Sequence, residues 1–182
     1  MAEIVKNVYK IIILGDPRVG KTSLRLRYLG KGFQKEYIST IGADFAVANY
    51  KDSFVQIWDL AGEYHFSKFV RPMFLGAQGV MIAFDLTNEQ SMQNIPKWIE
   101  NFHQIEPQDI PIVIIGNKVD LRDNTPFTIR TSKAEEFVKD LSIQSSDEIE
   151  YVETSALTGA NIQNAFNTLV DRIISKKTEP VT

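Results

Sequence analysis

The stretch Gly15-Asp16-Pro17-Arg18-Val19-Gly20-Lys21-Thr22 fits the phosphate-binding pattern G-x-x-x-x-G-K-[ST], in which x is any residue. The apolar, β-branched run at 8–14 precedes it and is typical of a buried strand, whereas apolar side chains at helical spacing follow at 23–29. A strand, a glycine-rich loop and a helix in this order form the setting in which the pattern binds phosphate. The sequence therefore predicts a nucleotide-binding loop.

Each part of this loop has an expected role. Backbone N–H groups of residues 18–22 would surround a diphosphate, and the positive end of the following helix dipole would face it. The Lys21 ammonium would reach the β- and γ-phosphates, and the Thr22 hydroxyl would ligate Mg²⁺. The loop alone indicates a nucleotide, but it identifies neither the base nor the reaction.

The composition is that of an ordinary globular protein. The 182 residues are 43% hydrophobic and 24% charged, with a net charge of −3 that argues against a nucleic-acid partner. The absence of cysteine excludes disulfides, thiolate chemistry and a prenyl or palmitoyl anchor for the sequence as given. No apolar run is long enough to cross a bilayer, and residues 1–6 lack the apolar h-region and cleavage site expected of a signal peptide. We expect a cytoplasmic monomer with one domain over 1–182, ordered from about 7 to 176, and a flexible tail at 177–182.

Alternation of apolar runs with helical patterns predicts an α/β fold. Strands are expected at 8–14, 45–50, 54–58, 79–84, 110–115 and 151–153. The short segment Lys51-Asp52-Ser53 predicts a hairpin, which makes one edge strand antiparallel in an otherwise parallel sheet. Ser132-x-x-Glu135 is typical of a capping box that begins a helix, and the polar segment 142–150 is expected to be a surface loop. Ligands of such sheets bind beyond the carboxyl ends of the strands.

Two further segments are expected to meet the metal and the terminal phosphate. Asp59 lies at the end of a predicted strand and could hold Mg²⁺ through water, although an aspartate that caps a turn is the alternative. The glycine of Ala61-Gly62 would let a backbone N–H approach the γ-phosphate. Thr40, in the polar loop 30–41, could bring a second hydroxyl to the metal.

The segment Asn117-Lys118-Val119-Asp120 predicts guanine as the base. The Asp120 carboxylate can accept hydrogen bonds from the guanine N1–H and amino groups, whereas adenine would present an acceptor at N1. A buried unpaired charge costs several kcal/mol, which gives strong discrimination. The stem of Lys118 can lie over the base, and Asn117 can tie the loop to its neighbours.

Two weaker signals complete the expected base site. A backbone N–H of Thr154-Ser155-Ala156 could meet the guanine carbonyl. Phe33, which is isolated in a polar loop, would contact the base with its face or serve as a hydrophobic anchor.

Taken in order, the motifs at 15–22, 40, 59–62, 117–120 and 154–156 resemble those of a Ras-superfamily small GTPase, from about 9 to 174. The segments 41–45, 56–59 and 84–87 are most similar to the Rab branch. The resemblance implies a small G domain with the P-loop NTPase fold and helices on both faces of the sheet. It also implies GTP or GDP with Mg²⁺, and the metal ligands would be Thr22, Thr40 and, through water, Asp59. Nucleotide contacts would come from 15–22 with Ser23, Phe33, Tyr37, Thr40, Gly62, Asn117, Lys118, Asp120, Ser155, Ala156 and Leu157.

The resemblance further implies a switch used in vesicle trafficking. The γ-phosphate and Mg²⁺ would hold loops 34–42 and 61–74, and hydrolysis would release them. Effectors, an exchange factor and a GTPase-activating protein would bind through 34–45 and 58–74. Phe45, Trp58 and Phe74 would form an aromatic trio for effectors, and the alternative is that Phe45 and Trp58 are core residues. The family's usual C-terminal cysteine is missing from the sequence as given, which leaves three alternatives: a lipidated C-terminus lies beyond it, the protein reaches membranes through a partner, or it does not bind membranes.

Four positions depart from the family pattern. Glu63 stands where most relatives have a Gln that orients the attacking water; a carboxylate cannot donate to the γ-phosphate and repels the transition-state charge. Pro17 would crowd an incoming arginine finger, and Arg18 would either replace that finger in cis or lie in solvent or against a surface acid. Leu157 replaces a Lys that often follows Ser-Ala.

The catalytic candidates are therefore Lys21, Thr40, Gly62, Glu63 and Arg18. We expect slow GTP hydrolysis, with a GTP-binding scaffold of negligible turnover as the alternative. A P-loop kinase is disfavoured by Asp120 and by the lack of an arginine-rich lid.

Overall fold

The computed structural model describes residues 7–32, 40, 42–60, 71–106, 109–145 and 148–178. Its strands form one six-stranded sheet in the order β2-β3-β1-β4-β5-β6, with every neighbouring pair parallel except β2 and β3. The strands are β1 Asn7–Leu14, β2 Ala43–Tyr50, β3 Ser53–Leu60, β4 Gly79–Asp85, β5 Ile112–Asn117 and β6 Ile149–Glu153. The predicted α/β sheet with one antiparallel edge strand is confirmed.

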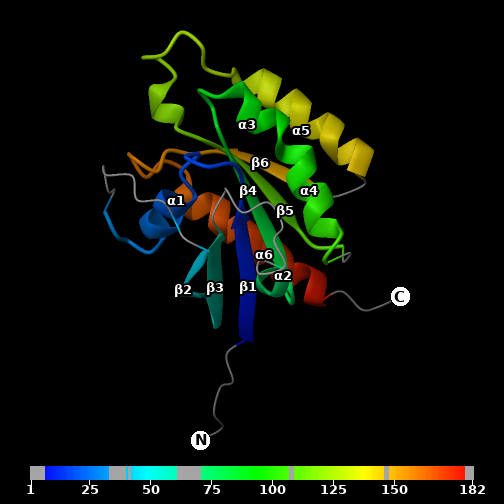
Figure 1. Ribbon diagram of the computed structural model, residues 1–182. Helices are drawn as coiled ribbons and strands as arrows, with labels where there is room; N and C mark the ends of the chain where they lie inside the picture. The colour runs from blue at the N-terminus through cyan, green and yellow to red at the C-terminus, as the bar shows by residue number, and fades with distance from the viewer. Residues whose placement is uncertain are drawn as a thin grey trace, which may run out of the picture.

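Helices cover both faces of this sheet, and Figure 1 shows α1 and α6 on one side and α3, α4 and α5 on the other. The helices are α1 Lys21–Tyr28, α2 Arg71–Phe74, α3 Glu89–Gln93, α4 Ile95–His103, α5 Thr131–Ser145 and α6 Ile162–Thr178, with a 3₁₀ turn η1 at Val119–Leu121. Among the described residues, no helix is long and apolar enough to cross a membrane.

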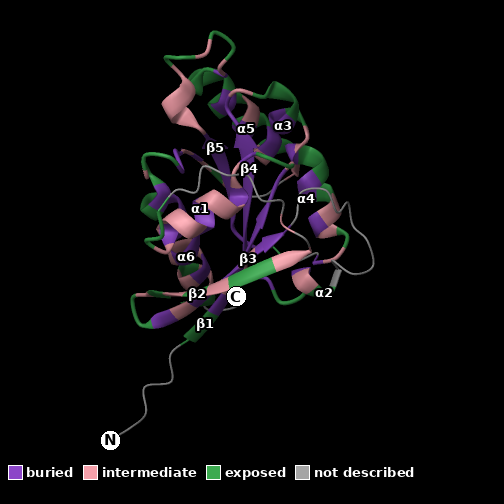
Figure 2. Ribbon diagram, turned by 60° about the vertical axis from the view of Figure 1, so that its left-hand side comes forward, coloured by how far each residue is buried: buried purple, intermediate pink, exposed green. Residues whose placement is uncertain are grey.

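The alternation of side chains along β1 divides the interior into two hydrophobic cores. Ile11 and Ile13 pack beneath α1 and α6, whereas Ile12 and Leu14 pack beneath α3, α4 and α5. All four side chains are at most 1% exposed, and Figure 2 shows the central strands buried between the two helical layers. Burial on both faces explains why the parallel strands are continuous apolar runs in the sequence.

The edge strand β2 is different because much of it faces solvent (Figure 2). Phe45 is 56% exposed and stacks on Trp58 of β3 with ring centroids 5.1 Å apart. Phe74 of α2 is only 1% exposed and packs against Phe102 in the core. The aromatic trio expected on one surface therefore contains a surface pair and a core residue.

Two predictions about α5 are wrong. The helix begins at Thr131, so Ser132 lies inside its first turn and the capping box does not form. Main-chain N–H groups at the helix start instead donate to the carbonyl of Arg130. The helix also continues to Ser145 through part of the segment expected to be a loop. At the C-terminal end of the described chain, α6 continues to Thr178, and the flexible tail expected at 177–182 stays a prediction.

Candidate functional site

The loop between β1 and α1 approaches the sheet so closely that glycine is required at both ends. A Cβ atom at Gly15 would lie 2.1 Å from the backbone oxygen of Ala83. Because the contacted atom belongs to the main chain and not to a flexible side chain, it cannot easily move away. Gly20 has φ of 100°, and its Cβ would lie 2.4 Å from the amide nitrogen of Asn117. The close approach places the loop at the carboxyl end of β1, where the phosphate was expected.

Lys21 follows this loop as the first residue of α1 and is only 7% exposed. Its Nζ donates to the carbonyl oxygens of Gly15 at 2.8 Å and Asp16 at 2.9 Å. Burial lowers the pKa of Lys21 to about 8, although the nearby carboxylates of Asp59 and Asp16 oppose the change. A buried ammonium held by carbonyl oxygens is suited to an anionic ligand, whose charge would restore its usual pKa.

The Asp16 side chain is held by the α3–α4 segment. Its two carboxylate oxygens accept from the amide of Asn94 at 2.6 Å and from the indole N–H of Trp98 at 2.8 Å. Asp16 therefore accepts from Lys21 through its main-chain carbonyl. Its carboxylate acts on Lys21 electrostatically and also anchors the loop to Asn94 and Trp98. No local sequence pattern indicates these roles for Asn94 and Trp98.

The three expected metal ligands lie together beside Lys21. The Thr22 hydroxyl donates to Asp59 Oδ2, and its oxygen is 3.0 Å from the Thr40 hydroxyl oxygen. Asp59 is fully buried, and its Oδ1 has no hydrogen-bond partner among the described residues. Burial raises the pKa of Asp59, against the opposing effects of Thr22, Lys21 and Arg25.

These oxygens fit Mg²⁺, which prefers hard oxygen ligands and commonly combines one or two carboxylates with phosphate oxygens and water. The orphaned Asp59 oxygen supplies an acceptor that a metal or a metal-bound water would satisfy. Because the set contains one carboxylate, most of the coordination must come from the nucleotide and water. The described residues contain no cluster of three or more His, Cys, Asp and Glu side chains.

Asn117 joins the base loop to the phosphate loop. Its amide nitrogen donates to the carbonyl of Val19 at 2.8 Å. Its amide oxygen accepts from the Thr154 hydroxyl and from the Ala156 N–H, both at 3.2 Å. One fully buried side chain therefore connects three segments, at the ends of β1, β5 and β6.

Asp120 and Lys118 are positioned by separate partners. The buried Ser155 hydroxyl donates to Asp120 Oδ1, which orients the carboxylate expected to bind guanine. The Lys118 ammonium pairs with Asp85 at the end of β4 at 2.5 Å, and Lys118 itself has φ of 71°. Asp85 was not among the predicted site residues. Leu157 is 46% exposed on the loop after Ser155.

Some predicted residues remain without a structural test. Pro17 and Arg18 are exposed, and Arg18 has a left-handed φ of 66°, but its catalytic role stays a prediction. Phe33, Tyr37, Gly62 and Glu63 lie outside the described residues, as do most of the two expected switch loops.

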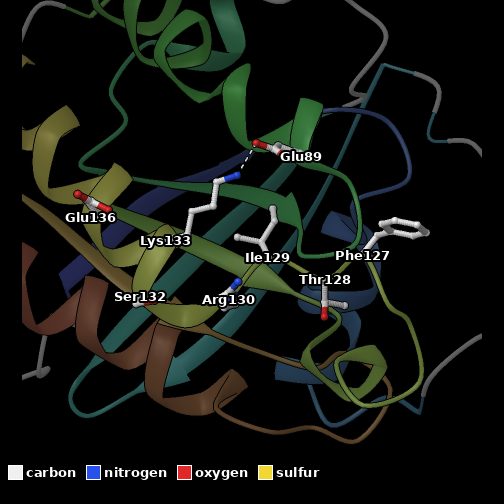
Figure 3. A pocket seen from close by; sticks show the side chains of 8 residues that line it. All are labelled: Glu89, Phe127, Thr128, Ile129, Arg130, Ser132, Lys133 and Glu136. Carbon is white, nitrogen blue, oxygen red and sulfur yellow. Dashed lines mark hydrogen bonds and ion pairs between the residues drawn. The ribbon is translucent and has the colours of Figure 1, made fainter.

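A cavity of about 390 Å³ lies elsewhere, between α3 and α5 (Figure 3). Across its opening, Lys133 forms an ion pair with Glu89 at 2.6 Å, while Phe127 is 83% exposed. None of the predicted nucleotide or metal residues lines it. It is therefore separate from the candidate site.

Comparisons with known proteins agree on one family. The family model of the Ras family matches residues 10–175. Human Ras-related protein Rab-8B is 35% identical over 180 residues, which cover 97% of this chain and 83% of that protein. Ras-related protein Rab-10 of Diplobatis ommata is 34% identical over 173 residues, covering 93% and 82%, respectively. Bos taurus Rab-8A is 34% identical, with 97% and 83% covered.

Proposed function

The chain belongs to the Ras family and is a Rab-like small GTPase, and from this premise we propose that it is a GTP/GDP switch with slow intrinsic hydrolysis. The observation that carries the proposal is the junction made by Asn117. Its hydrogen bonds hold the phosphate loop beside the two loops that would read the base. One nucleotide would therefore contact Lys21 at one end and Asp120 at the other.

The phosphate end would be bound by Lys21 and by backbone N–H groups of the loop. Thr22 and Thr40 would hold Mg²⁺ directly and Asp59 would hold it through water; the metal would neutralise charge on the β- and γ-phosphates. Lys21 is already desolvated and oriented by two carbonyl oxygens, so little reorganisation would be needed when the phosphate binds.

The base end would select guanine. Ser155 donates to one oxygen of Asp120, which leaves the remaining acceptor positions of the carboxylate for the guanine N1–H and amino groups. An adenine at this position would place a lone pair against the carboxylate, at a cost of several kcal/mol. GTP and GDP should therefore bind in strong preference to ATP.

The switch itself would act through Thr40 and Gly62. Both would respond to the γ-phosphate, so its loss would release loops 34–42 and 61–74. Effectors, an exchange factor and a GTPase-activating protein would bind at 34–45 and 58–74, and the stacked pair Phe45 and Trp58 supports an apolar docking surface there. Membrane trafficking, with peripheral attachment through partners, is the corresponding cellular role.

Hydrolysis would be slow because Glu63 cannot donate to the γ-phosphate and Pro17 would obstruct an arginine supplied by a partner. Arg18, next to Pro17 on the exposed part of the loop, would partly compensate in cis. The alternative is a GTP-binding scaffold with negligible turnover, which would use the same site without the chemical step.

Single-turnover phosphate release from bound GTP tests this proposal in the wild-type protein and in two variants. Glu63→Gln should raise the rate by about tenfold or more, because the amide restores a donor without the repelling charge. Arg18→Ala should lower the rate by about tenfold, whereas Arg130→Ala, at an exposed arginine outside the candidate site, should not alter it.

The outcomes separate the alternatives. An unchanged rate in Arg18→Ala rejects the cis-arginine role. No phosphate release from the wild-type protein, despite tight GTP binding, supports the scaffold. Equal competition by ATP would exclude a guanine-specific site.

A further inference from the structure

Arg25 is a buried cation on α1, one turn after Thr22. Its side chain is only 6% exposed, which is unusual for an arginine unless it is paired. The sequence gives no indication of this burial, because charged residues on a surface helix normally face solvent.

Two carboxylates of very different exposure share this guanidinium. Arg25 Nη2 forms an ion pair with Asp44 Oδ2 at the start of β2, where the Asp44 side chain is 61% exposed. Arg25 Nε lies 3.9 Å from Oδ2 of the fully buried Asp59. This Nε has no hydrogen-bond partner among the described residues, so its attraction to Asp59 is purely electrostatic.

The Asp59 oxygen near Arg25 is the one that accepts from the Thr22 hydroxyl. Asp59 is also the one carboxylate in the donor set assigned to Mg²⁺. A resident positive charge beside that carboxylate opposes the entry of a divalent cation, because like charges repel more strongly where solvent is excluded. The same charge compensates Asp59 whether or not a metal is bound.

We propose that Arg25 is a built-in cation of the magnesium site, which weakens Mg²⁺ binding and makes nucleotide retention less dependent on the metal. Asp44 tempers this effect, because its negative charge offsets part of the guanidinium charge. The proposal rests on the proposed guanine-nucleotide site and describes its regulation by metal.

The first test measures retention of a fluorescent GDP analogue as Mg²⁺ is titrated, and its release rate with Mg²⁺ or with a chelator. Arg25→Met keeps the length and apolar stem of the side chain but removes its charge. The Mg²⁺ midpoint, which is the Mg²⁺ concentration at which half of the analogue is retained, should fall by about threefold to tenfold. Chelation should accelerate release more than in the wild-type protein. Arg130→Met, the control at an exposed arginine outside the candidate site, should leave the midpoint unchanged.

A second variant shifts the midpoint in the opposite direction. Asp44→Asn removes an exposed carboxylate, so it should not impair folding, and it leaves the guanidinium charge unshared. The Mg²⁺ midpoint should therefore rise. If Arg25→Met does not fold, this variant alone decides: an unchanged or lower midpoint overturns the proposal.

The remaining outcomes are distinct. An Arg25→Met midpoint equal to that of the wild-type protein, or a shift equal to that of Arg130→Met, also overturns the role of Arg25. Failure of the wild-type protein to bind GDP at any Mg²⁺ concentration would instead overturn the proposed function.

Discussion

Gly15 illustrates how a single residue fixes the position of the phosphate loop. The atom that a Cβ would meet is the carbonyl oxygen of Ala83, which belongs to the central strand β4. Gly32, in contrast, has no positive φ, and no atom of the described residues lies within 4 Å of an added Cβ there. The two glycines therefore provide a matched pair of substitutions.

We predict that Gly15→Ala destabilises the fold by about 3 kcal/mol or more, because the methyl group overlaps backbone and the φ of 131° is unfavourable for alanine. Gly32→Ala should change the free energy of unfolding by less than about 0.5 kcal/mol. Urea unfolding of both variants measures the difference. Equal stability of the two would show that the loop can move away from β4.

Sequence patterns predict the residues that contact a ligand better than they predict the residues that hold those side chains in place. Lys21, Thr22 and Asp120 follow from short motifs, because the chemistry of phosphate, metal and guanine demands those side chains at those spacings. The bonds from Asn94 and Trp98 to Asp16 join residues 78 and 82 positions apart. Such contacts arise only when the chain has folded, so no local pattern indicates them.

At the scale of elements, an ion-pair network connects β6, η1 and α5. Arg122, directly after η1, donates to both carboxylate oxygens of Glu153 at 2.6 and 2.7 Å. The Tyr151 hydroxyl donates to Glu153 at 3.0 Å, and the Thr131 hydroxyl at the start of α5 donates at 3.3 Å. Asp120 lies in η1, and its partner Ser155 lies in the loop after Glu153. The network therefore fixes both the turn and the loop that orient Asp120.

This network predicts a pH dependence of stability. Burial alone would raise the pKa of Glu153, but the hydrogen bonds from Arg122 and Tyr151 outweigh it and lower the pKa below its usual value of 4.5. The unfolded state therefore binds the proton more readily, and the contribution of Glu153, present above that value, is lost as the pH falls through the folded-state pKa.

Glu153→Gln should lower the free energy of unfolding at neutral pH by about 1 kcal/mol or more and lose less stability than the wild-type protein between about pH 6 and about pH 3. Glu89→Gln removes an exposed ion pair with Lys133 and serves as the control. Urea unfolding across this range measures both. An identical pH profile for Glu153→Gln and the wild-type protein contradicts the prediction.

The sequence indicates the buried strands well, but it indicates the start of α5 and the shortest helices poorly. The buried strands were found because sheets covered on both faces need long apolar runs. The predicted start of α5 is wrong because Ser132 and Glu135 match a capping pattern, whereas the helix already begins at Thr131. The short elements α3 and η1 were missed, since stretches of a few residues carry too little periodicity to be recognised.

At the scale of the whole molecule, the sheet separates two cores, and the candidate site lies where the carboxyl ends of β1, β5 and β6 come together. A ligand that bridges the loops at these ends would bind the folded chain and not the unfolded one. Its binding free energy should therefore add directly to the free energy of unfolding.

We predict that GDP with Mg²⁺ at about 100 times its dissociation constant stabilises the protein by about 2.7 kcal/mol, which raises the melting temperature by about 5–10 °C. ADP at the same concentration should produce no shift. Thermal unfolding followed by circular dichroism measures both. Asp120→Ala should remove most of the GDP effect, and an equal response to ADP would contradict the assignment of the base site.

Asn117 has a consequence for the order of events when a nucleotide leaves. Since one amide side chain is bonded at the same time to Val19, Thr154 and Ala156, neither the phosphate loop nor the base loops can shift without straining the others. The two ends of the ligand should therefore come free in one concerted step, without a long-lived half-released intermediate. A partner protein that displaces either the phosphate loop or the base loops would therefore weaken the binding of the whole nucleotide.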